Sequence, residues 1–122
     1  MKRPEEALQR QVASYLNAVP GLLWWATANQ RGTRSRAEMG VLKAMGVRPG
    51  VPDICLILPG GKIGLLELKA AKGRLSEHQR GFIDAAMSKG ALVGVCYSLT
   101  DVADHLNTWL GPYGYRVPRL AA

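Results

Sequence analysis

The sequence predicts a single α/β domain in which helices cover a central mixed β-sheet. Short apolar runs typical of strands alternate with segments whose apolar residues recur at helical spacing, and the order is α-β-(α)-β-β-α-β-α. The chain has 122 residues, of which 48% are hydrophobic and 20% charged. These values are ordinary for one soluble domain with its own core, so we expect residues 1–122 to form a single domain.

The first part of the chain is predicted to hold two helices and one strand. Residues 5–19 place apolar side chains on one helical face, and a Pro-Gly pair follows them. Residues 22–28 are a strand candidate in which Trp24 and Trp25 face opposite ways, so that one of them belongs in the core. Residues 36–46 are compatible with a short helix.

Two apolar runs at 52–58 and 63–70 come next, and they are expected to form a hairpin across Pro-Gly-Gly. Ser76 then begins a capped helix with Gly90 just past its end. The continuous apolar run 91–98 is typical of a strand buried on both faces. A last amphipathic helix follows, and it begins at Ser98 or Thr100.

Three charged residues interrupt the apolar hairpin: Asp53, Glu67 and Lys69. A charge beside a packed core costs several kcal/mol unless it is paired or bound to a metal. Glu67 and Lys69 are two apart on a strand and therefore share a face. An odd loop at 59–61, or a bulge near Pro52, would set Asp53 opposite Glu67, whereas a two-residue loop would turn Asp53 to the wrong face.

Two carboxylates and an ammonium on one patch predict divalent-metal chemistry. Carboxylates and a backbone carbonyl are oxygen ligands that Mg²⁺ prefers. Lys69 would orient or deprotonate an attacking water and offset charge in the transition state. The structural alternative is an ion pair near a sheet edge, but such a pair would add little stability for three charges among apolar strands, so we favour the catalytic interpretation.

The charge balance points to a polyanionic partner. Sixteen Lys and Arg against nine Asp and Glu give a net charge of +7, and such an excess on a small domain favours nucleic acid first. No apolar run is long enough to span a bilayer and no signal peptide is visible, so we expect a cytoplasmic protein without a membrane partner. Cys55 and Cys96 lie in apolar runs without CxxC spacing, which favours small buried side chains over a zinc site.

The pattern "GVPDICLIL" followed by "GLLELK" resembles the PD-(D/E)xK nuclease superfamily, with Pro52-Asp53 as one half of the motif and Glu67-Leu68-Lys69 as the other. The GxPD form, the neighbouring "GRLSEHQRGF" and the chain length resemble more narrowly the VRR-NUC family, the virus-type replication-repair nucleases. The similarity runs from about residue 5 to 105. It implies a restriction-endonuclease-like core with the order α-β-β-β-α-β.

The resemblance also implies roles for individual residues. Asp53 and Glu67 would bind Mg²⁺ or Mn²⁺ with the carbonyl of Leu68, and Lys69 would handle the water. A glutamate of the first helix usually completes the site. Glu5, on the helix face that packs beneath the sheet, is our choice over the neighbouring Glu6, although a helix N-terminus favours an acidic residue for its own reasons.

Other polar residues are candidates for supporting roles. Gln79 matches the family's glutamine after the ExK motif and could reach a phosphate or the attacking water, and its alternative is a plain surface residue. His78 and His105 have no partner at ligand spacing and are interpreted as structural or surface residues. Candidates for contact with the DNA backbone are Asn29, Arg31, Arg34, Lys72 and Arg74.

The resulting functional prediction is a metal-dependent DNA endonuclease without a small-molecule cofactor. By resemblance, stand-alone domains of this size act as dimers on branched DNA such as four-way junctions, and a phage or prophage origin in a bacterial host fits that picture. A dimer also has a physical rationale, because two strands cut symmetrically need two sites. The alternatives are a flap or nicking nuclease, and an inactive nucleic-acid-binding module that the basic charge would serve equally well.

Overall fold

The computed structural model describes residues 4–27 and 35–120. Its helices are α1 (Pro4–Leu16), α2 (Arg36–Ala44), α3 (Glu77–Ser88) and α4 (Leu99–Leu110), and its strands are β1 (Leu23–Ala26), β2 (Ile54–Ile57), β3 (Ile63–Leu68) and β4 (Leu92–Cys96). The strands form one sheet in the order β1-β2-β3-β4. The first three strands pair antiparallel, and β4 pairs parallel to β3. The predicted α/β class and the predicted order of elements are confirmed.

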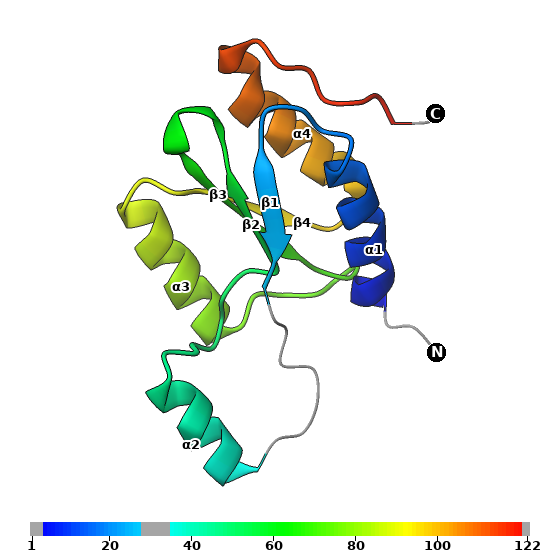
Figure 1. Cartoon of the computed structure of the whole chain (residues 1–122). Coiled ribbons are helices and arrows are strands. Elements are labelled where there is room, and N and C mark those ends of the chain that lie inside the picture. The colour runs from blue at the N-terminus through cyan, green and yellow to red at the C-terminus, as the bar shows by residue number, and fades with distance from the viewer. Residues whose placement is uncertain (1–3, 28–34, 121–122) are drawn as a thin grey trace.

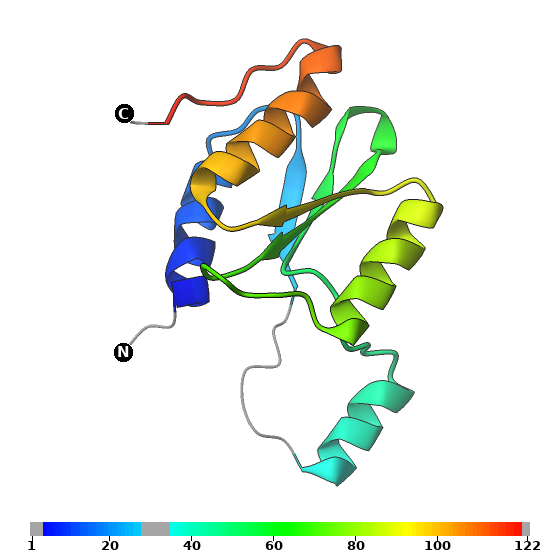
Figure 2. The same cartoon turned by 180° about the vertical axis from the view of Figure 1, so that it is seen from behind.

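The sheet lies between two helical layers. Figure 1 shows α1 and α4 together on one side of the sheet and α3 on the other, and Figure 2 shows the same arrangement from behind. The main core fills the space between the sheet and the α1–α4 layer, and its fully buried members include Val12, Ile54, Leu66 and Leu106. No helix in the described parts of the chain is both long and apolar enough to cross a membrane.

Alternation along the strands decides which side chains enter this core. Ile54 and Leu56 of β2 are fully buried, whereas Cys55 between them is only partly buried. Successive side chains of a strand point to opposite faces, so every second residue of β2 and β3 meets the α1–α4 layer. The other set, which includes Leu65 and Glu67, points toward the side that α3 covers.

Of the two alternatives that the sequence left open for the hairpin between β2 and β3, an odd loop or a bulge near Pro52, the structure has the odd loop. Its loop is a short 3₁₀ turn over Pro59–Gly61, and it is closed by Leu58 N–H donating to the Lys62 carbonyl at 2.7 Å. Ile54 pairs with Leu66, and this register, continued by one residue, sets Asp53 opposite Glu67. Both glycines of the loop have a φ of +78°, a conformation that glycine adopts without steric cost.

Several boundaries differ from the predictions. The first helix ends at Leu16 rather than near residue 19, and Ser98, not Thr100, caps α4 by accepting from Asp101 N–H. The expectation of a strand buried on both faces is only partly met. β4 is an edge strand that contacts α3 and α4. It has a neighbouring strand on one side only, and its side chains at Leu92, Val93 and Val95 remain partly exposed.

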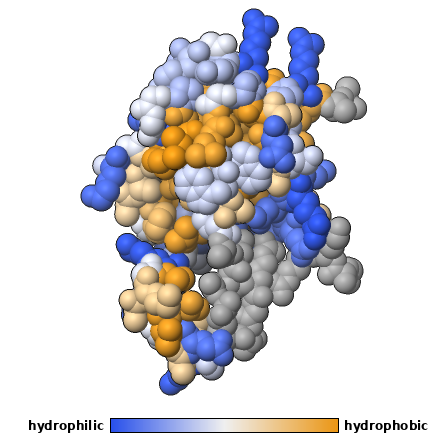
Figure 3. All heavy atoms as spheres, viewed as in Figure 1, coloured by the Kyte–Doolittle hydropathy of each residue, from blue (hydrophilic) through white to orange (hydrophobic). Residues whose placement is uncertain are grey.

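Helix α2 stands apart from the rest of the domain. It lies beyond the end of the sheet where β2 begins (Figure 1), and none of its side chains is buried. Met39 and Val41 of α2, and Met45 just past its end, are each more than half exposed, and hydrophobic residues form much of the surface of this region in Figure 3. A nine-residue helix is marginal in water on its own. Because α2 also exposes large apolar side chains, it is the element whose stability would gain most from being covered.

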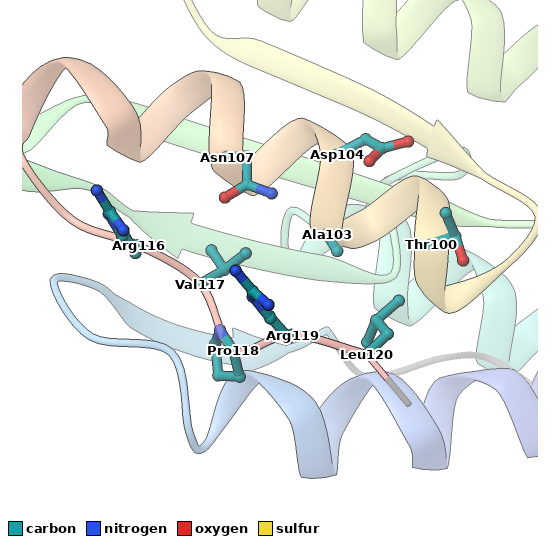
Figure 4. Close-up of a pocket in the computed structure, with 9 residues that line it drawn as sticks. All are labelled: Thr100, Ala103, Asp104, Asn107, Arg116, Val117, Pro118, Arg119 and Leu120. Carbon is teal, nitrogen blue, oxygen red and sulfur yellow. The ribbon is translucent and has the colours of Figure 1, made fainter. Parts of the chain in front are cut away.

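The segment after α4 turns back and runs along α1 and α4. Tyr15 of α1 donates its hydroxyl to the Pro118 carbonyl at 2.7 Å and ties this segment down. A hollow of about 480 Å³ lies between the segment and α4 (Figure 4), with Thr100, Asp104 and Asn107 on the helix and Arg116 and Arg119 on the segment. None of the residues that the sequence predicts for the active site lines it.

Gly94 is predicted to be intolerant of any side chain, because a Cβ atom there would lie 2.7 Å from the His105 ring. We expect Gly94→Ala to lower the free energy of unfolding by about 1–3 kcal/mol in urea titrations. Gly81→Ala is the matched control, since its Cβ meets nothing within 4 Å in α3, and it should stabilise the protein by about 0.5–1 kcal/mol. A neutral Gly94→Ala would contradict the packing described for β4 and α4.

Candidate active site

Asp53 sits just before β2 and is held by backbone groups on two sides. Its Oδ2 accepts a hydrogen bond from Leu68 N–H at 2.8 Å, and its own carbonyl accepts from Thr27 N–H at 2.9 Å. The Thr27 hydroxyl also donates to the Pro52 carbonyl at 2.8 Å. The side chain of Asp53 is therefore fixed across the hairpin, and the residue is only 8% exposed.

Glu67 and Lys69 extend from the end of β3 on the same side as Asp53. Glu67 is 3% exposed and Lys69 is 9% exposed, which is rare for charged residues unless they are paired. Lys69 Nζ lies 3.9 Å from Glu67 Oε2. The other oxygen, Glu67 Oε1, is buried and accepts no hydrogen bond from the residues that the structure describes, although the protonated carboxyl can hydrogen-bond to Asp53.

Gln79 joins this group from the first turn of α3. Its Nε2 donates to Glu67 Oε2 at 3.2 Å, while its Oε1 accepts from Ser76 N–H at 2.9 Å. Ser76 in turn accepts from Gln79 N–H, so that the pair forms a capping box. The cap fixes the rotamer of Gln79 and directs its amide nitrogen to the carboxylate, which argues against a plain surface role.

Gly50 connects the approach to Asp53 with the start of α3. Its φ is +82°, and a Cβ atom there would lie 2.3 Å from the His78 carbonyl oxygen. Only glycine allows two backbones to approach this closely. The chain that leads into β2 is thereby packed against the helix turn that carries Gln79, so the positions of Asp53 and Gln79 are fixed relative to each other.

The proximity of the two carboxylates changes the acidity of Glu67. Burial is the main cause, and the neighbouring Asp53 carboxylate the second, of a rise in the pKa of Glu67 to about 8, while Lys69 opposes the rise. A buried carboxyl beside another negative charge retains its proton because the charged form is poorly solvated and repelled. A cation held by these carboxyls would lower the pKa of Glu67, because it favours the charged form.

The two glutamates at the start of α1 have different surroundings. The charge of Glu5 contributes to the raised pKa of Glu67, as the smallest of its causes, so Glu5 is electrostatically coupled to the site. Glu6 accepts a hydrogen bond from Arg10 at 3.2 Å in an exposed ion pair one turn along the helix. This arrangement is in line with the choice of Glu5 over Glu6.

The donor set suits a hard divalent cation. In the described part of the chain no three His, Cys, Asp or Glu side chains form a ready metal cluster; the set consists of two carboxylates, Asp53 and Glu67. Mg²⁺ commonly uses one or two carboxylates and keeps several waters, so it does not require a third acidic side chain. The unpartnered, buried Glu67 Oε1 is an acceptor for such an ion, and the residues therefore fit a metal.

The remaining candidates lie in different surroundings. Lys72 and Arg74 are exposed on the segment that follows β3, whereas Asn29, Arg31 and Arg34 lie outside the described residues. His105 packs its ring against Trp109 with centroids 5.4 Å apart, and His78 is exposed, so neither joins the carboxylates. Burial raises the pKa of the Cys96 thiol to about 12, which makes it a poor nucleophile.

Three residues near the site were missed by sequence reasoning: Thr27, Gly50 and Tyr97. Thr27 binds the backbone on both sides of the Pro52–Asp53 peptide, and Tyr97 donates its hydroxyl to the Gly73 carbonyl at 3.0 Å. Each of them acts on a segment at least 24 residues away in the chain. The contacts of Thr27 and Tyr97 have no local pattern that could have revealed them. For Gly50, the glycine of the GxPD form was a local signal that two backbone segments approach each other closely.

Glu67 is predicted to make the metal-free protein less stable as the pH rises. Below about pH 4.5 both folded and unfolded chains hold the proton; between 4.5 and about 8 the unfolded chain releases it while the folded chain keeps it. The free energy of unfolding should therefore fall by roughly 1.4 kcal/mol per pH unit over this window. Urea titrations in EDTA between pH 4.5 and 8 measure this slope.

Glu67→Gln should flatten this profile because the amide does not titrate. Asp84→Asn, which removes an exposed carboxyl of α3, is the matched control and should leave the slope in place. A profile that is the same for wild type and Glu67→Gln would contradict the buried carboxylate pair described above.

The family model of the VRR-NUC domain matches residues 26–99. A solved structure described as a VRR_NUC domain is similar over 88% of this chain and 97% of its own, with a TM-score of 0.60 and 22% sequence identity, and at this identity the likeness shows the fold. None of the curated proteins that were compared matches the chain.

Proposed function

The chain belongs to the VRR-NUC family, whose domain is a nuclease domain, and we propose that it is a metal-dependent DNA endonuclease with all 122 residues in one domain. The observation that carries this proposal is the gathering of Asp53, Glu67 and Lys69 at one end of the hairpin, each less than a tenth exposed. A protein that only bound DNA would gain nothing from buried carboxylates next to phosphates.

The residues that would hold Mg²⁺ or Mn²⁺ are Asp53, Glu67 and the Leu68 carbonyl, with Glu5 near them. When bound, the cation supplies a Lewis acid that offsets negative charge on the phosphoryl group. The Leu68 N–H holds the Asp53 carboxylate in place, and Gln79 holds that of Glu67. Both acidic side chains are therefore oriented before any ligand arrives, which is the preorganisation that electrostatic catalysis requires.

In this proposal Lys69 handles the water and the phosphate. Its ammonium lies 3.9 Å from Glu67 Oε2, so it can orient an attacking water while its positive charge offsets the charge that builds on the phosphate. Water adds to phosphorus in line with the leaving oxygen, one new P–O bond forms, and the bond to the 3′ oxygen breaks. The proton of the water ends on that oxygen, and the products carry 5′-phosphate and 3′-hydroxyl ends.

Positive side chains near the site would hold the DNA backbone. Lys72 and Arg74 are exposed directly after the strand that carries Glu67 and Lys69, and the sequence assigns Asn29, Arg31 and Arg34 to the same role. The chain's net charge of +7 supports a polyanionic substrate. Branched DNA such as a four-way junction is the proposed preferred substrate, and flap or nicked duplexes are the alternatives.

Cleavage assays test the reaction and the substrate together. Labelled four-way junction, flap, linear duplex and single strand are incubated with Mg²⁺, Mn²⁺ or EDTA. Wild type should cut the junction only with metal, and Lys69→Ala should reduce the rate at least about 100-fold, because water orientation and charge are both lost. Lys62→Ala is the matched control, since it removes an exposed lysine from the far end of the same hairpin.

Other outcomes separate the alternatives. Equal cutting of all substrates retains the nuclease and removes the junction preference. Tight binding without cleavage in any metal, with Asp53→Asn binding more tightly than wild type, would support the inactive binding module. Lys69→Ala cutting at the wild-type rate would show that the site assignment is wrong.

A dimer completes the proposal, because one chain carries one site and two strands are cut. The uncovered Met39 and Val41 of α2 and Met45 just past its end are the surface that a second copy would bury. Sedimentation equilibrium should give twice 13.2 kDa for wild type and 13.2 kDa for Met45→Glu. Met87→Glu, at a methionine of α3 that is 56% exposed, is the matched control and should stay dimeric. A monomeric wild type at tens of micromolar would contradict the dimer.

A further inference from the structure

We propose that Tyr97 is a positioning residue for Lys69, because its hydroxyl holds the turn that packs against the lysine stem. This inference rests on the proposed nuclease function and adds a residue that the mechanism above does not use. Tyr97 follows β4 and is 46% exposed, so core packing does not explain the contacts that it makes.

The turn in question spans residues 70–73, directly after Lys69. It is closed by Gly73 N–H donating to the Ala70 carbonyl at 2.8 Å. Its third residue, Lys72, has a φ of +66° and is the one residue other than glycine with positive φ among the described residues. A turn of this kind normally has glycine or asparagine at that position, so the turn is under strain and needs outside support.

The turn touches Lys69 along its stem. A Cβ atom built on Gly73 would lie 3.5 Å from both Cβ and Cδ of Lys69, and 2.9 Å from the Ala70 carbonyl oxygen. The Gly73 backbone therefore lies beside the lysine methylenes, and it is the Ala70 carbonyl rather than the lysine that leaves no room for a Cβ atom there. Since Lys69 is nearly buried, a shift of this backbone moves the stem and with it the ammonium beside Glu67.

Tyr97 connects this turn to the sheet and to α4. Its hydroxyl donates to the Gly73 carbonyl at 3.0 Å, and its own N–H donates to Asp101 Oδ2 at 2.8 Å. One residue earlier, the Cys96 carbonyl accepts from Lys69 N–H at 2.9 Å. Two hydrogen bonds thus join the end of β4 to the Lys69 segment: one to the backbone of Lys69 itself and one to the turn that follows it.

Tyr97→Phe removes one of these two points and tests the inference. In single-turnover cleavage at saturating DNA and metal, we expect the rate to fall about three- to tenfold, the size of effect that one hydrogen bond supports. DNA affinity and melting temperature should stay at wild-type values. Tyr113→Phe, which removes the hydroxyl of another half-exposed tyrosine, is the matched control and should cleave at the wild-type rate.

A second substitution separates positioning from general loosening. Lys72→Gly relieves the strained φ, so in the Tyr97→Phe background it should restore part of the lost rate at saturating DNA, even though a charge is removed. The proposal would be overturned if Tyr97→Phe cleaves at the wild-type rate, if its slower rate follows a lower melting temperature or weaker DNA binding, or if Lys72→Gly restores none of the lost rate. The DNA affinity of the Lys72→Gly variants does not enter this comparison, because Lys72 is itself proposed to contact DNA.

The position of Lys69 can also be followed without cleavage. In metal-free protein labelled with ¹³C at lysine Cε, the Lys69 signal should shift in Tyr97→Phe and stay in place in Tyr113→Phe. An unchanged signal would overturn the positioning role whatever the activity of the protein. A wild type that cleaves no DNA would instead refute the proposed function, and the signal would still report on the turn.

Discussion

The hydrogen bond from Leu68 N–H to Asp53 Oδ2 is the contact on which the arrangement of the site depends. Lys69 N–H bonds to β4, so Leu68 N–H faces the opposite neighbour, β2. A side-chain oxygen of Asp53 takes the place of a backbone carbonyl at the end of the β2–β3 ladder. One bond therefore closes the sheet, satisfies a buried donor and directs a carboxylate to Glu67.

This closure brings together like charges that would otherwise separate. Asp53 and Glu67 share a nearly dry environment, and the pKa of Glu67 is raised first by this burial and second by the Asp53 carboxylate. Lys69 opposes this rise only in part, and Glu67 Oε1 accepts no hydrogen bond from the described residues. Without a metal, two buried carboxyl groups stay this close only if the surrounding fold holds them in place, and a bound cation would lower the free energy of the pair.

The helical layers on the two sides of the sheet hold the two carboxyl groups in place. The α1–α4 layer buries the alternate residues of β2 and β3 and so fixes the strands that carry the acidic residues. On the other side, the capped start of α3 meets the chain before β2 through the bare backbone of Gly50. Helix α2 and the turn at 70–73 lie outside these layers; α2 exposes Met39 and Val41, and the turn holds Lys72 at positive φ.

The sequence by itself determined the element order and the shared face of Glu67 and Lys69, and it limited the hairpin to an odd loop or a bulge if Asp53 was to lie opposite Glu67. These features follow from side-chain periodicity and loop parity, which act between residues close in the chain. Only the tertiary structure decided that Gln79 reaches Glu67, that Tyr97 meets Gly73, and that Gly94 must admit the ring of His105. Such contacts depend on how helices and turns dock across the sheet, and docking is set by the packing of the whole core rather than by any local pattern.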